Sequence, residues 1–272
     1  MQGMLKWGWG ILFMGFTLSA CFPQPTVPSP TETFAPTETP ILTPSPFPLI
    51  SSTPVLLSPL PLFTPSPLPS ASPTPLSFQL CSPLKDYTFA DLREIESQPF
   101  IAPRPGKDDG HHGVDFAHWQ YKDRVTLEGV EVQSVLPGSV AGLVVEKYPY
   151  GNAIIIETGV EYLSPAVITT FQIQPGQSLY LLYAHLQAPA PFQMGDPIAC
   201  GAGIGLVGNT GASGNPHLHL ETRVGAAGAT FASMEYYKTT STNEERANYE
   251  RWRFLGDFIL FNPWELLNLA SD

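Results

Sequence analysis

The chain is poor in cysteine and in positive charge. Its 272 residues include three Cys, and 13 Lys+Arg stand against 24 Asp+Glu. No basic cluster occurs anywhere along the sequence. This argues against a nucleic acid partner, because phosphate binding depends on Lys and Arg that neutralise the backbone. The excess of Asp and Glu over Lys and Arg is expected simply to keep the folded domain soluble.

A long apolar run is also missing. Lys6 is followed by the apolar stretch Trp7–Leu18, which is too short for a comfortable membrane span and fits a signal peptide. The stretch ends in Leu18–Cys21 (LSAC), which resembles the lipobox of bacterial lipoprotein signal peptides. The resemblance implies removal of residues 1–20 and acylation of Cys21, so that lipid holds the protein to the outside of the cell membrane. An ordinary secretory signal with an incidental Cys is the alternative.

Proline is concentrated in one segment. Seventeen of the 30 prolines lie between Phe22 and Leu80, where only Glu32 and Glu38 are charged. Such a segment cannot bury a core, and we expect residues 21–80 to form an extended tether that reaches up to ~180 Å at ~3.1 Å per residue. Residues 81–272 then form one folded domain, with a core at about 109–225 and a C-terminal extension at 226–272.

Two cysteines remain once Cys21 is assigned to lipid. Cys81 and Cys200 are candidates for a disulfide in an oxidising compartment. The bond would close a loop of about 120 residues and stabilise the fold by up to ~5 kcal/mol. Two free buried thiols are the alternative.

The folded part has short apolar runs separated by Gly and Pro. Runs rich in β-branched or aromatic residues predict strands at Val130–Val135, Ser139–Glu146, Ala153–Thr158, Ser178–His185 and His217–Val224. Short helices are expected at Asp91–Glu96, at Asn243–Arg253 after Ser241 and Thr242 as caps, and at Pro263–Leu269. The expected class is mainly antiparallel β, as two packed sheets or a partly open barrel with few short helices.

Histidines and one aspartate form a pattern suited to metal binding. In an extended chain His111 and Asp115 share a face, and Gly113 between them leaves space for an ion. His217 and His219 share a face of the last predicted strand. One of this pair, with His111 and Asp115, would supply two nitrogens and one oxygen to Zn²⁺ and leave a fourth position for water. Spacing alone does not decide which of the two is the ligand.

The remaining histidines divide into two groups. His185 in the segment Tyr183–Leu186 is suited to proton transfer near neutral pH. His112 and His118 are expected to have no metal role.

These motifs occur in an order that resembles the lysostaphin/LytM-type metallopeptidases. The resemblance covers about Asp109 to Val224, and the matching segments are His111–Asp115, Val132–Val144, Tyr150–Asn152 with Ile154–Ile156, Tyr183–Leu186, Gly195–Ile198 and Gly205–His219. It implies a fold of the lysostaphin-like (duplicated hybrid motif) type. Departures are a long loop at His118–Gly129 and apparent insertions at Val160–Gln177 and Gly225–Leu260.

The resemblance also implies roles for single residues. His111, Asp115 and His219 would bind one zinc ion per chain, and His185 and His217 would act on the attacking water and the oxyanion. Glu221 lies on the face of His219 and is a candidate partner for it, although a plain surface role is the expected one.

The implied activity is hydrolysis of peptide bonds in peptidoglycan stem peptides or cross-bridges. A non-catalytic peptidoglycan-binding module that activates separate amidases is the alternative, but such relatives have lost metal ligands and this chain retains all five residues. A lipid-anchored stalk protein would explain the tether and leave the histidines unexplained.

Overall fold

The computed structural model describes residues 78–271. The predicted signal peptide, the acylated Cys21 and nearly all of the predicted tether lie outside these residues. In the described part, no helix is both long enough and apolar enough to cross a membrane.

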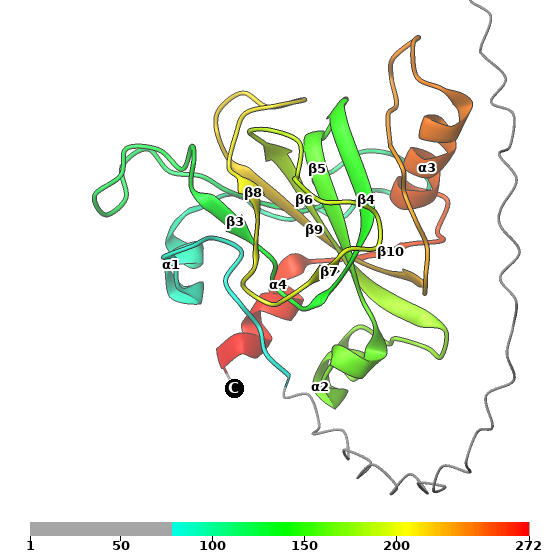
Figure 1. Cartoon of the computed structure of the whole chain (residues 1–272), viewed down its shortest axis with the longest axis horizontal. Coiled ribbons are helices and arrows are strands. Elements are labelled where there is room, and N and C mark those ends of the chain that lie inside the picture. The colour runs from blue at the N-terminus through cyan, green and yellow to red at the C-terminus, as the bar shows by residue number, and fades with distance from the viewer. Residues whose placement is uncertain (1–77, 272) are drawn as a thin grey trace, which may run out of the picture. The chain divides into compact units, whose positions relative to one another are not determined.

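Ten strands and four short α-helices make up the described residues (Figure 1). The strands are β1 (Glu96–Gln98), β2 (Val114–Phe116), β3 (Glu131–Gln133), β4 (Gly138–Lys147), β5 (Gly151–Thr158), β6 (Gln177–Leu186), β7 (Pro197–Ile198), β8 (Gly203–Leu206), β9 (Leu218–Ala226) and β10 (Ile259–Phe261). The helices are α1 (Phe89–Glu94), α2 (Pro165–Thr170), α3 (Asn243–Arg253) and α4 (Pro263–Leu267), with 3₁₀ turns at η1 (Val160–Tyr162) and η2 (Asn268–Ser271).

The strands form one large antiparallel sheet and one small one. The large sheet has the order β1-β2-β9-β6-β5-β4-β7, and β10 pairs with β9. The small sheet consists of β3 and β8 alone. The prediction of a mainly antiparallel β domain with few short helices is confirmed, and the described strands do not close into a barrel. The second sheet is only a two-stranded ribbon.

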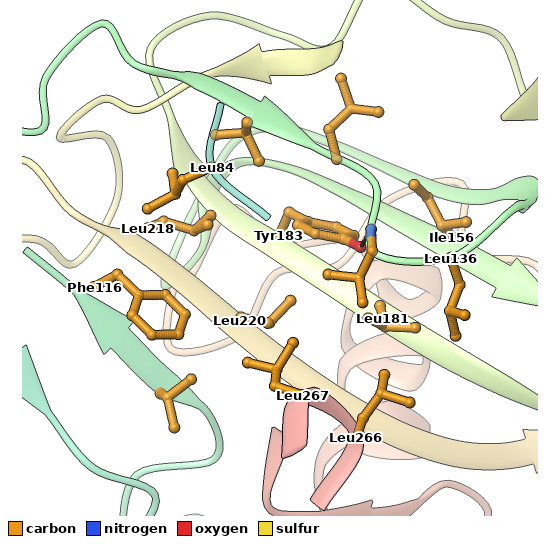
Figure 2. Packing of buried hydrophobic residues seen from close by; sticks show 14 of the residues in the cluster. Leu84, Phe116, Leu136, Ile156, Leu181, Tyr183, Leu218, Leu220, Leu266 and Leu267 are labelled. Carbon is orange, nitrogen blue, oxygen red and sulfur yellow. Dashed lines mark hydrogen bonds between the residues drawn. The ribbon is translucent and has the colours of Figure 1, made fainter. Parts of the chain in front are cut away.

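Side chains on both faces of the large sheet are buried, so its long strands have few exposed positions. On one face, Leu181 and Tyr183 of β6 pack with Leu218 and Leu220 of β9 and with Leu266 of α4 (Figure 2). The neighbouring side chains Tyr180, Leu182 and Ala184 of β6 point to the opposite face and belong to a second cluster. This alternation follows from the two-residue period of a strand.

Residues of the C-terminal extension cover the second face. Phe231, Tyr249, Trp252 and Phe258 are buried against β5 and β6. Helix α3, predicted at these bounds, begins with Thr242, whose side chain and that of Glu245 form a reciprocal capping box. The segment Gly225–Leu260, which looks like an insertion relative to the family pattern, thus completes the core.

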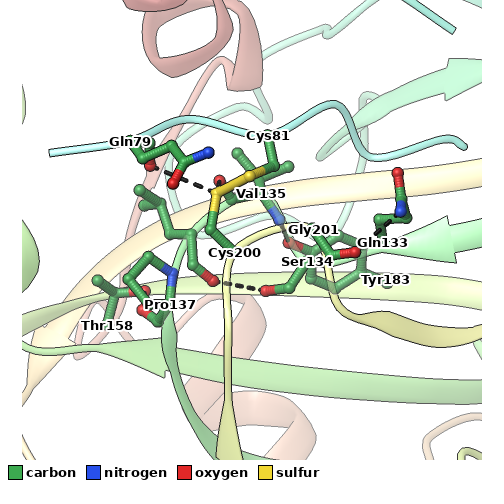
Figure 3. Close-up of a disulfide and its surroundings, with 11 residues drawn as sticks. Gln79, Cys81, Gln133, Ser134, Val135, Pro137, Thr158, Tyr183, Cys200 and Gly201 are labelled. Carbon is green, nitrogen blue, oxygen red and sulfur yellow. Dashed lines mark hydrogen bonds between the residues drawn. A yellow bond between two sulfur atoms is a disulfide. The ribbon is translucent and has the colours of Figure 1, made fainter.

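The other apparent insertion is also part of the core. In the segment Val160–Gln177, Ser164 caps α2, and Val167 and Phe171 are buried in the first cluster. Beside this cluster a disulfide joins Cys81 to Cys200 (Figure 3), and the Cys81 amide donates to the carbonyl of Val135.

The five predicted strands are present with ends shifted by a few residues. The shorter β1, β2, β7, β8 and β10, of two to four residues each, were not predicted from the sequence. Helix α1 begins before the predicted Asp91, because Thr88 caps it and accepts from the Asp91 amide.

Candidate metal centre

Strands β2 and β9 bring the three predicted ligands together. Asp115 is paired directly with His219 in the register of the two strands. Oδ1 of Asp115 lies 2.7 Å from Nδ1 of His219 and 3.1 Å from Nε2 of His111. The ligand atoms of the three residues all lie within 4.8 Å of one another. Val114 and Phe116, which flank Asp115, are buried in the core on the other face and hold this orientation.

His111 reaches the site by a different backbone path from the predicted one. Only Val114–Phe116 is a strand, and a bend occupies residues 112–113. His111 is held instead by an isolated bridge in which its amide and carbonyl both bond to Ile101. The prediction that the two side chains meet is correct, but strand alternation is not the reason.

Gly113 leaves space for the His219 ring. A Cβ at this position would lie 2.3 Å from the carbonyl oxygen of Leu220 and 2.8 Å from Cε1 of His219. Real Cβ atoms do not approach so closely. The absence of a side chain at residue 113 is therefore a condition for the position of His219.

Each histidine of the trio is oriented by a bond from its other ring nitrogen. Nδ1 of His111 donates to the carbonyl of Pro99 at 2.8 Å, which leaves Nε2 as the ligand atom. Nε2 of His219 lies 3.3 Å from Oε1 of Glu221, which leaves Nδ1 as the ligand atom. A carbonyl or a carboxylate oxygen can only accept, so both tautomers follow from the partners.

The electrostatics of the trio suit a cation. Burial works against charge, but the close contacts with His111 and His219 lower the pKa of the Asp115 carboxyl far below its ordinary value. Against the same burial, Asp115 and Glu221 raise the pKa of His219 to about 9. The negative carboxylates that favour a proton on His219 also favour a divalent cation. Two imidazole nitrogens and one carboxylate oxygen match the ligand preference of Zn²⁺.

His185 and His217 lie beside the trio, with ring centroids 4.5 Å apart. Nδ1 of His185 donates to the carbonyl of Thr210 at 2.7 Å, and Nδ1 of His217 donates to the carbonyl of Asn215 at 2.8 Å. In the neutral form of each ring the proton is therefore on Nδ1, and Nε2 can accept a hydrogen bond. Burial, followed by the neighbouring His219 and His217, lowers the pKa of His185 to about 3.

The backbone of His185 departs from a regular strand. Tyr183 points into the first core cluster, so strand alternation would send His185 to the same side. Instead His185 has a φ of 61°, a conformation that costs free energy in a residue other than Gly. Its amide is held by the carbonyl of Tyr150. This strained backbone accompanies the position of the imidazole beside His217.

All five residues line one pocket of about 480 Å³. Its wall also includes Ser97, Tyr150, Asn215 and Arg253. A second pocket, which shares Ser97 and Asn215 with the first, is lined by Trp119, a side chain that is 89% exposed. The long loop that follows Asp115 thus extends the cavity on one side.

Glu221 is not a surface residue, and the expectation that it would be one is wrong. Its side chain is fully buried and lies on the same face of β9 as His219. Burial alone would raise the pKa of its carboxyl, but Arg223, the His219 bond and Arg253 lower that pKa well below the ordinary value. The two-residue spacing from His219 indicated that Glu221 shares a face with it. The burial of Arg223 beside Glu221 could not be foreseen from the sequence.

The two remaining histidines lie outside the trio. The buried His112 accepts a hydrogen bond from Nη2 of Arg223 at its Nδ1, over 2.8 Å. His118 lies 3.0 Å from the hydroxyl of Tyr87 and lines the second pocket. Neither is part of the ligand cluster found among the described residues.

Comparisons with known proteins match part of the chain to a known family. Residues 109–231 match the model of peptidase family M23. No curated protein matches the chain. Among solved structures, the catalytic domain of lysostaphin from Staphylococcus simulans is 20% identical with a TM-score of 0.36, and the match covers 67% of this chain and 99% of that one.

Two further solved structures have similar sequence identities and TM-scores. A mutant catalytic domain of the prophage-encoded M23 protein EnpA from Enterococcus faecalis is 20% identical, covers 56% of this chain and 92% of that one, and has a TM-score of 0.36. A zinc-containing peptidase from Vibrio cholerae is 27% identical, covers 47% and 32%, and has a TM-score of 0.32. This chain thus spans only a third of the Vibrio protein's length. The matched segment 109–231 contains the whole ligand trio with His185 and His217, and this segment is a domain of the peptidase family M23, the lysostaphin/LytM type of peptidase.

Proposed function

We propose that the chain is a zinc-dependent endopeptidase that hydrolyses peptide bonds of peptidoglycan. The observation that carries the proposal is the convergence of Nε2 of His111, Oδ1 of Asp115 and Nδ1 of His219 within 4.8 Å, in the wall of a polar pocket beside two further histidines. When bound, zinc would polarise the scissile carbonyl and acidify a water molecule.

His185 and His217 would carry the proton transfers. Each neutral ring has Nε2 as its acceptor, because its Nδ1 proton is donated to a backbone carbonyl. One ring accepts a proton from the attacking water and returns it to the leaving amine. The ring centroids are only 4.5 Å apart, so the two histidines face the same part of the pocket.

The second pocket would bind a further part of the substrate. It adjoins the first at Ser97 and Asn215, and Trp119 offers an exposed aromatic face there. Aromatic faces provide contact area at small conformational cost. Replacement of Trp119 by Ala should raise KM and leave the zinc content unchanged.

Purified peptidoglycan tests the proposed activity. The chain should contain one zinc, release soluble peptide fragments and stop when a chelator removes the metal. Mass spectrometry of the fragments identifies the bond that is cut. A chain that holds zinc and binds the wall, yet releases nothing from any wall preparation, would be the non-catalytic module instead.

We also propose that Cys21 anchors the protein outside the membrane, on the basis of the Leu18–Cys21 motif in the sequence. Wild-type protein should fractionate with membranes and incorporate labelled fatty acid. Cys21→Ser should abolish the labelling. Labelling that persists in this variant would refute the anchor.

A further inference from the structure

A buried cluster of charged and aromatic groups lies under His219. The carboxylate of Glu221 is fully buried and is surrounded by donors. Its Oε1 accepts from Tyr150 Oη at 2.8 Å, Arg253 Nη1 at 3.2 Å and His219 Nε2 at 3.3 Å, and its Oε2 accepts from Trp252 Nε1 at 2.9 Å and Arg223 Nε at 3.0 Å. Five side chains thus point donors at one carboxylate.

Two of these donors belong to the end of α3. Trp252 and Arg253 lie in the C-terminal extension, beyond the segment 109–231 that matches the family model. Arg253 is held in turn by Asp108, whose Oδ1 accepts from Nε at 2.7 Å. Trp252 is fully buried and packs edge-on against Phe231. The end of α3 is therefore fixed next to the candidate metal centre.

The arrangement gives Glu221 a specific task. A carboxylate surrounded only by donors acts as an acceptor on both oxygens, so its bond to His219 requires the proton on Nε2. With Nε2 bound to Glu221, Nδ1 of His219 is the nitrogen that faces His111 and Asp115 and could bind an ion. A buried carboxylate without compensating donors would be costly. Trp252 and Arg253 supply part of this compensation.

We propose that helix α3 is an integral part of the metal site, with Trp252 and Arg253 as positioning residues. They hold the Glu221 carboxylate, and Glu221 orients His219 for the ion. The inference rests on the proposed zinc site and assigns to this chain's own extension a role in binding the metal. Loss of such an outer partner commonly weakens metal affinity 10- to 100-fold.

Zinc affinity of the full chain tests the proposal by competition with a chromogenic chelator. Arg253→Gln should bind Zn²⁺ roughly 10- to 100-fold more weakly, and Trp252→Phe, which keeps an aromatic ring and loses the N–H, roughly 10-fold more weakly. Arg253→Lys should recover part of the loss. The matched control is Arg251→Gln on the same helix, because Arg251 donates to the carbonyl of Thr230 and stacks on Phe231. Its affinity should stay within twofold of wild type.

A structural role alone would not alter the metal's own spectrum. In the Co²⁺-loaded chain, the d–d absorption should change in position or intensity for Trp252→Phe and Arg253→Gln and stay unchanged for Arg251→Gln. If Arg253→Gln does not fold, Trp252→Phe and Arg253→Lys decide the matter. Wild-type affinity and spectrum in these variants would overturn the inference. Altered binding in a chain that cuts no wall would leave it standing and refute the proposed hydrolysis.

Discussion

Oδ1 of Asp115 and Nδ1 of His219 lie 2.7 Å apart, although 104 positions separate the two residues in the chain. Their strands β2 and β9 pair so that the residues stand directly opposite each other. The contact depends on register, because a shift of one residue would turn one of the side chains into the core. The candidate metal centre is thus a consequence of how two strands pair.

Histidine variants should separate metal binding from proton transfer. His219→Ala removes a ligand atom and should abolish zinc retention. His185→Ala should retain zinc and lower turnover by about 10²-fold or more, because only the proton acceptor is lost. Zinc content by atomic absorption and fragment release from peptidoglycan measure the two effects. Equal loss of zinc in both variants would overturn the assigned roles.

Gly113→Ala should lower zinc affinity without altering any ligand. The added methyl would meet the Leu220 carbonyl and the His219 ring at less than 3 Å, so the ring must move. Gly214→Ala is the matched control, since a Cβ there meets open space and its φ is not positive. Chelator competition compares the two variants. Normal affinity in Gly113→Ala would show that the glycine is not needed.

Stability should fall as the pH decreases from about 7 towards 4. Burial is the main cause that lowers the pKa of His112 to about 4, so the folded state holds the ring neutral while the unfolded state binds a proton at about 6.5. The contribution of the neutral His112 ring to the free energy of unfolding is therefore complete above pH 6.5. It is lost as the pH falls towards the folded-state pKa of about 4. Between pH 7 and 5 the loss is roughly 2 kcal/mol.

Urea unfolding of the metal-free chain at pH 7 and pH 5 measures this dependence. His112→Gln cannot titrate and should show a smaller decrease in the free energy of unfolding than wild type. An equal decrease in both proteins would assign the pH effect to other groups.

Reduction of the disulfide should destabilise the domain. The Cys81–Cys200 bond spans 119 positions, and release of so long a loop costs about 4–5 kcal/mol in the chain-entropy model. The Cys81→Ser/Cys200→Ser variant should unfold at lower urea concentration than the oxidised wild type. A reductant should lower the urea midpoint of the wild type and leave the midpoint of the double variant unchanged. An unchanged midpoint for the oxidised and reduced wild type would contradict the prediction.

Local patterns in the sequence were enough to place much of the site. The alternation in His217–Val224 correctly predicts a strand with Leu218 and Leu220 in the core and His219 on the other face, because burial of one face fixes a strand's orientation. The cap at Thr242 likewise predicts the first turn of α3. Both signals are local, and the fold preserves them.

Other features depend on contacts between distant segments. Glu221 is buried because α3, some 30 residues away along the chain, covers it with Trp252 and Arg253. The positive φ of His185 follows from its tertiary surroundings, since a strand pattern predicts the opposite direction for its side chain. Neither can be deduced from composition or periodicity, because each arises from contacts with segments far away in the chain.

Anomalous diffraction at the zinc absorption edge, from crystals of the chain grown with zinc, tests the central claim most directly. The account predicts one strong peak bonded to Nε2 of His111, a carboxylate oxygen of Asp115 and Nδ1 of His219, at about 2.0–2.2 Å from each. A peak elsewhere, or none between these three side chains at full zinc loading, would contradict it.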